Sequence, residues 1–168
     1  MRSIGAGIVM IILCAAAATS RSTQALAEPD HDYWFLGASV DEMTLHYIDS
    51  DSIVSPNGGL MQAWTTALTS NSAPQSVDRY VVALREVNCQ TRRVRALRSA
   101  VYHRRDDYEV PMLKDEPDAW TYAAHGSFGE AELEFMCRGA TARTSLGVPL
   151  PKGVTLEQHA VSIFEAMK

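Results

Sequence analysis

Cys89 and Cys137 constrain this chain more than any other pair of residues, because we expect the segment that holds the third cysteine to be removed. The first 27 residues contain a basic Arg2, a short apolar stretch and small residues that end at Ala27. This order is typical of a secretory signal peptide. The apolar stretch is shorter than a membrane anchor, which needs about 20 residues. Cleavage after Ala27 removes Cys14 and leaves two cysteines in an exported chain.

Two cysteines in an oxidising compartment allow one intramolecular disulfide. A bond between Cys89 and Cys137 would close a long loop, and the chain-entropy model gives such a bond roughly 4 kcal/mol. Two free thiols, or bonds between chains, are the alternative.

A lipid anchor on Cys14 is the alternative to cleavage after Ala27. The residue before a lipid-attached cysteine is normally small, and Leu13 is not. We therefore expect an exported protein with no membrane tether, in the periplasm or at the cell surface. Its oligomeric state stays open.

The first half of the mature chain is strand-like and the second half is helical. Alternating or β-rich segments predict five strands, and the Asn-Gly pair in the turn at 56–59 sends the third strand back antiparallel to the second. The strands are expected at Tyr33–Ser39, Met43–Asp49, Leu60–Leu68, Arg79–Cys89 and Val94–Tyr102. The last two form a central hairpin.

Two helices follow. Ser127 and Glu130 form a capping box that opens a helix ending near Gly139, with Cys137 near its apolar face. A bond to Cys89 would fasten this helix to the end of a central strand. A second capping box, Thr155 to Gln158, opens another helix. This helix either packs on the domain or binds a partner protein, and packing on the domain is favoured. We divide the chain into a signal peptide (1–27), a sheet domain with a helix (28–139), and a linker with an amphipathic helix (140–168).

Several short motifs resemble the bacterial surface-adhesin protein E family over about Tyr33 to Arg138. They are Trp34, the stretch YIDSDSI from Tyr47 to Ile53, Trp64, the stretch NCQTRRVR, Trp120 and a short helix ending at Cys137. The resemblance implies an α+β fold: an antiparallel β-sheet of about six strands, with a C-terminal helix disulfide-tethered to one face. It also implies an exported protein that binds host matrix or serum proteins. The helix beyond Gly139 lies outside the shared part.

Catalytic chemistry is not indicated, so we expect a non-enzymatic protein without cofactor or metal. The histidines are scattered at His31, His46, His103, His125 and His159, and a metal site needs clustered ligands. Ser127 is better explained as a helix cap than as a nucleophile. Asp49 and Asp51 could bind calcium, although such residues more often face water at a strand end. The three tryptophans are expected to pack in the core rather than to form a binding surface.

Arginine is concentrated in one segment of an otherwise acidic chain. Eight arginines lie between Arg79 and Arg105, opposed only by Glu86, in a chain of formal net charge -5. The candidate ligand-binding residues are Arg92, Arg93, Arg95, Arg98, Arg104 and Arg105. On a solvent-facing hairpin they would attract an anionic polymer or an acidic protein face, and export argues against nucleic acid. The alternative is a solvated hairpin paired internally with acids such as Asp106 and Asp107.

The faces of the strand limit which arginines can act together. In a regular strand, Arg93 and Arg95 share one face, while Arg92 and Arg98 share the other. Two functions remain open from the sequence. One is an adhesin-like binding module that uses the hairpin, and the other is a periplasmic envelope protein that docks a partner through its C-terminal helix.

Overall fold

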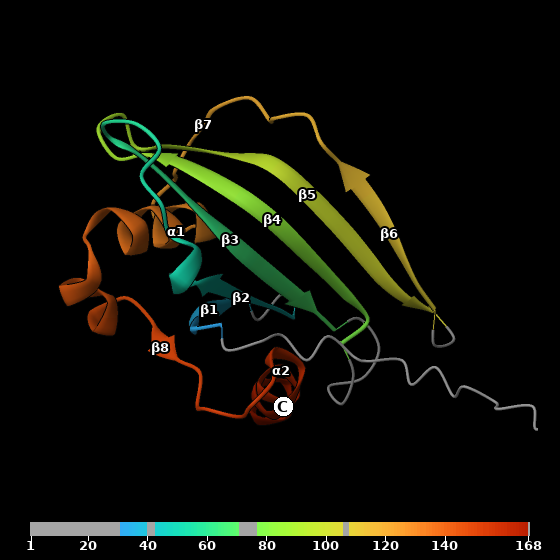
Figure 1. The fold of residues 1–168 in the computed structure, drawn as a ribbon. Coiled ribbons are helices and arrows are strands. Elements are labelled where there is room, and N and C mark those ends of the chain that lie inside the picture. The colour runs from blue at the N-terminus through green and yellow to red at the C-terminus, as the bar shows by residue number, and fades with distance from the viewer. Residues whose placement is uncertain (1–30, 40–42, 71–76, 106–107, 168) are drawn as a thin grey trace, which may run out of the picture.

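The computed structural model describes residues 31–39, 43–70, 77–105 and 108–167. The predicted signal peptide lies outside these ranges, and so do Asp106 and Asp107. Within them, one antiparallel sheet carries a helix on each face (Figure 1). The predicted α+β fold is therefore confirmed.

The sheet is a meander of six long strands with a two-residue strand added near each edge (Figure 1). Its order is β6-β5-β4-β3-β2-β1-β8, and β7 pairs with β5. The strands are β1 (Tyr33–Ser39), β2 (Thr44–Asp49), β3 (Leu60–Thr69), β4 (Arg79–Asn88), β5 (Arg93–Arg105), β6 (Tyr108–Lys114), β7 (Thr121–Tyr122) and β8 (Val148–Pro149). Short 3-10 helices lie at Ser50–Ser52 and Ala140–Ser145. The α-helices are α1 (Phe128–Cys137) and α2 (Leu156–Ala166).

Strand β6 is the long strand that the sequence pattern did not show. It holds Pro111, which cannot donate a backbone hydrogen bond and argues against a central strand. The structure places β6 at the edge of the sheet, where a proline is tolerated.

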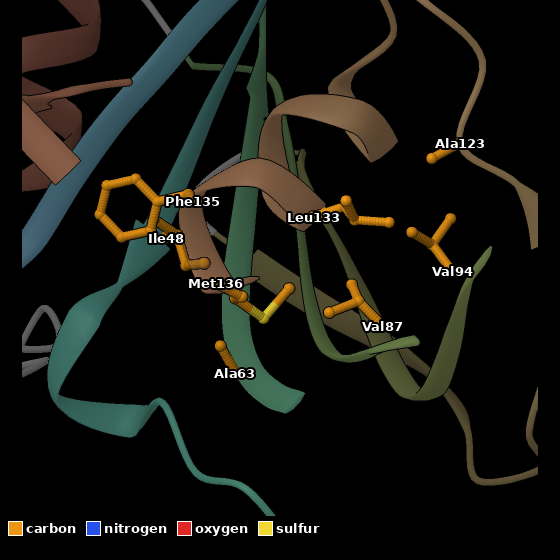
Figure 2. Close-up of a cluster of buried hydrophobic side chains, with 8 residues drawn as sticks. All are labelled: Ile48, Ala63, Val87, Val94, Ala123, Leu133, Phe135 and Met136. Carbon is orange, nitrogen blue, oxygen red and sulfur yellow. The ribbon is translucent and has the colours of Figure 1, made fainter. Parts of the chain in front are cut away.

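Helix α1 covers one face of the sheet. Its Leu133, Phe135 and Met136 are buried against Ile48 and Val87 of the strands, in the cluster that Figure 2 shows. Ser127 caps the helix by accepting a hydrogen bond from the backbone N–H of Glu130, as predicted. The Glu130 carboxylate, however, accepts from Gly126 N–H at 2.8 Å, one residue earlier than in the expected box.

Helix α2 covers the opposite face. Successive residues of a strand point to opposite faces, and Tyr47 packs with Ala160 and Phe164 of α2 while Ile48 packs with α1. The predicted capping box of Thr155 and Gln158 is present. The apolar stripe of α2 therefore packs on the domain, as the favoured alternative predicted.

Candidate functional site

The β4–β5 hairpin, which holds most of the candidate residues, is bonded covalently to α1. Cys89 and Cys137 form a disulfide with their Cα atoms 5.7 Å apart. This confirms the predicted bridge and excludes the alternative of free thiols. The bond joins the residue after β4 to the last residue of α1, so the hairpin turn and the helix are held together.

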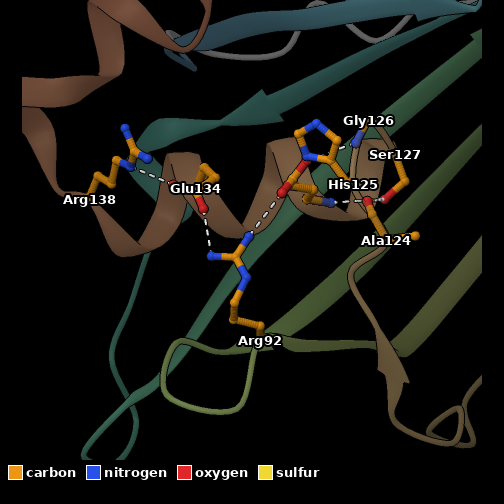
Figure 3. Close-up of polar contacts among 8 residues, drawn as sticks. Arg92, Ala124, His125, Gly126, Ser127, Glu134 and Arg138 are labelled. Carbon is orange, nitrogen blue, oxygen red and sulfur yellow. Dashed lines mark hydrogen bonds and ion pairs between the residues drawn. The ribbon is translucent and has the colours of Figure 1, made fainter.

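Arg92 makes a second connection between the turn and α1. It adopts a positive φ of 54°, and its guanidinium donates to Glu134 at 2.7 Å and to Glu130 at 3.0 Å (Figure 3). Hydrogen bonds from Arg92, and then the charge of Arg138, lower the pKa of the Glu134 carboxyl. Arg92 is therefore paired inside the domain while its side chain stays 36% exposed, and its partners are acids of α1 rather than Asp106 and Asp107.

A buried ion pair lies beneath α1. The Arg85 guanidinium bonds the Glu132 carboxylate at 2.9 Å, and Glu132 is 4% exposed. Burial raises the pKa of Glu132, and the charge of Arg85 opposes that shift. Beside this pair, the His46 ring stacks on Phe128 with centroids 3.5 Å apart, and burial followed by the charge of Arg85 lowers the His46 pKa to about 4. The sequence did not reveal this cluster, because nothing local marks which arginine of the hairpin faces inward.

A β-bulge changes which arginines share a face. Leu84 pairs with Arg98 while Arg85 pairs with Ala96, so Leu97 is the extra residue. Arg98 therefore lies on the same face as Leu84. The expectation that Arg98 lies opposite Arg93 and Arg95 is wrong, because it assumed an uninterrupted strand.

These three arginines lie on the α2 side of the sheet, beyond the part that α2 covers. We call this surface the hairpin face and define it by Trp64, Leu84, Arg93, Arg95, Arg98 and Trp120. Trp64, Leu84 and Arg98 form one row across β3, β4 and β5. Neighbouring strands are about 5 Å apart, so Trp64 and Arg98 lie about 10 Å apart at their backbones.

The arginines of the hairpin face differ in their surroundings. Arg95 bonds Glu86 at 2.5 Å and lies 4.4 Å from the centre of the Trp120 ring. Arg98 bonds Asp115 at 3.1 Å, with both side chains largely exposed. Arg93 is exposed, and it has no ion pair among the residues that the structure describes. Arg93 and Arg98 are thus the members most accessible to a ligand.

Trp64 corrects a second expectation. Trp34 packs beside Phe135, with ring centroids 5.4 Å apart, and borders the core as predicted. Trp64 instead keeps 38% of its surface exposed. Its position opposite Leu84, on the face away from α1, places it outside both apolar clusters.

The remaining candidate residues either make contacts within the fold or have side chains that the structure does not describe. Arg104 and Arg105 end β5, and their side chains are outside the described residues. Asp49 is 2% exposed and contacts His31 at 2.9 Å, so the expectation that it faces water is wrong. Within the described ranges, no group of three or more His, Cys, Asp or Glu residues could hold a metal ion.

Comparisons with known proteins identify the family. Neither the curated proteins nor the solved structures include a match to this chain. None of the helices in residues 31–39, 43–70, 77–105 and 108–167 has the length and apolar character needed to cross a membrane. The family description that matches, over residues 34–138, is surface-adhesin protein E. The match covers most of the sheet together with α1, and the chain therefore belongs to the surface-adhesin protein E family.

Proposed function

We propose that this protein is an exported, non-enzymatic binding module that holds an extracellular matrix or serum protein against its hairpin face. Membership of the surface-adhesin family supports an adhesin-like role. The observation that carries the proposal is the bulge at Leu97, which brings Arg98 to the face of Arg93, Arg95 and Trp64. Tryptophan and arginine are the residues most enriched at the energetic centres of protein interfaces.

The charges of this surface favour a protein partner over an anionic polymer. Arg95 is paired with Glu86, and Arg98 is paired with Asp115. A polymer of uniform negative charge would meet these carboxylates as well as the arginines. A protein surface of mixed charge can oppose each group with its own partner, and such complementarity gives specificity and register.

Helix α2 bears on the alternative of an envelope protein that docks a partner through its C-terminal helix. Ala160 and Phe164 are fully buried, and Leu156, Ile163 and Met167 pack against the same cluster. The apolar stripe is therefore already occupied by the sheet. This supports the hairpin face as the binding surface.

The test compares a charge reversal on the hairpin face with an equal charge reversal at exposed sites elsewhere on the protein. Arg93→Glu with Arg98→Glu changes the hairpin face, and Arg79→Glu with Lys152→Glu changes the net charge equally at exposed sites elsewhere. Purified mature protein is passed over immobilised fibronectin, collagen and albumin, and over a heparin surface. We expect one protein ligand to be bound by wild type, to be lost with the first pair of substitutions and to be retained with the second.

Trp64→Ala should weaken the same interaction at least tenfold, because it removes the exposed aromatic of the surface. Equal binding by wild type and both double variants would refute the hairpin face as the site. Retention on heparin alone would replace the protein partner by a polyanion. Protease treatment of intact cells separates the two locations, since a surface protein is cleaved and a periplasmic one is protected.

A further inference from the structure

A cleft of about 530 Å³ lies between α1 and the outer strand β1. Its lining includes Leu36, Gly37, Phe128, Ala131, Arg138 and Leu146. The lining is mixed, because it also includes His125, Ser127, Glu130, Glu134 and Ser145, and one wall runs along α1 from Phe128 to the C-cap residue Arg138. None of the residues of the hairpin face lines it.

The other wall is a sheet edge that the protein covers only in part. Strand β8 pairs with β1 at Trp34 and Phe35, through Pro149 and Val148. The chain joins this edge at Gly147, just before β8, where a Cβ atom would lie 3.0 Å from the carbonyl oxygen of Phe35. Among the described residues, no strand pairs with the outer side of positions 36–38. An open edge of this kind is a template for a further strand.

The charges on the helix wall are already paired. Glu134 bonds Arg92 and Arg138, and Glu130 bonds Arg92 and His125. The wall therefore presents no excess charge that would select a strongly acidic or basic ligand. Apolar contact with Phe128, together with backbone hydrogen bonds to the sheet edge, is what the cleft offers.

We propose that this cleft binds an extended peptide segment of a partner protein as an additional strand on β1. The peptide would continue the line of β8, antiparallel to β1, and would lie along α1. Strand addition of this type takes its affinity from main-chain hydrogen bonds and its specificity from pockets for alternate side chains. Apolar side chains at alternate positions fill the space between Leu36, Ala131 and Leu146. The site is separate from the hairpin face and does not depend on its function.

The experiment uses a phage-displayed library of linear peptides, selected on the disulfide-bonded mature chain. The best peptide is synthesised, and its affinity is measured by fluorescence polarisation. Ala131→Trp fills the cleft and should weaken binding at least tenfold. The matched control Ala166→Trp, at an exposed position of α2, should leave binding unchanged, as should the Arg93→Glu and Arg98→Glu pair.

Hydrogen exchange on the wild-type protein supplies a second measurement that needs no variant. A strand added to β1 should slow exchange of backbone amides at positions 36–39 when peptide is bound. A library with no enriched binder would overturn the proposal. So would a selected peptide whose binding survives Ala131→Trp, or one that protects amides of β6 and leaves those of β1 unchanged.

Discussion

Reduction of the Cys89–Cys137 bond should lower the free energy of unfolding by about 4 kcal/mol. The two cysteines are 48 positions apart, and closing a loop of that length removes about 4 kcal/mol of chain entropy from the unfolded state at room temperature. The ion pairs of Arg92 with α1 remain in the reduced protein, so the turn is not released entirely. This keeps the reduced protein folded while its stability falls.

Urea unfolding of oxidised and reduced wild-type protein, followed by circular dichroism, measures this difference with identical side chains in both samples. The double substitution Cys89→Ala and Cys137→Ala should cost slightly more, because both side chains pack against the apolar cluster under α1. A loss below about 1 kcal/mol on reduction would refute the argument from chain entropy. It would mean that the reduced unfolded chain is already compact, or that forming the disulfide strains the native state.

Three further outcomes are expected. His46 has a folded pKa of about 4, below its unfolded value of 6.5, so the unfolded state binds the additional proton between these pH values. Stability should fall by up to about 3 kcal/mol as the pH drops from 6.5 to 4, and His46→Gln should flatten this part of a urea titration against pH. Arg85→Ala leaves Glu132 buried without its partner and should cost about 3–5 kcal/mol in urea unfolding. Replacing both residues by Met and Leu should recover most of that loss, and no recovery would contradict the desolvation argument. N-terminal sequencing of exported protein should begin at Glu28, and a lipid-modified Cys14 would overturn this processing.

Local sequence patterns predicted the parts of the fold that depend on local chemistry. The Thr155 and Gln158 capping box, the apolar stripe of α2 and the alternation that separates Tyr47 from Ile48 could all be found from residue spacing. The disulfide followed from counting cysteines. Strand β6 was missed because Pro111 is acceptable only at an edge, and edge position is a property of the assembled sheet.

The candidate site was less predictable, because it depends on register. No sequence signal around Leu97 indicates a bulge. The face of the sheet on which Arg98 lies could therefore not be assigned from the alternation of residues. Arg92 and Arg85 lie in the same basic segment as Arg93, yet their acidic partners are on α1, more than 35 positions away. The sequence shows that positive charge is concentrated in this segment. Only the packed structure shows which of its arginines are paired with acids of α1.

The bulge at Leu97 also divides β5 into two segments, and the alternation of side chains between the two faces of the sheet shifts by one residue between them. On its N-terminal side, Val94 and Ala96 are set against α1, while on its C-terminal side Tyr102 is set against Tyr80, with the two rings stacked 4.4 Å apart. Deleting the single residue Leu97 would leave Ala96 opposite Arg85 and Arg98 opposite Leu84, so both segments would keep their present faces and only the bulge would be lost. The bulge therefore absorbs a difference of one residue in length, so family members without the extra residue would display the same faces of both segments on a straighter strand.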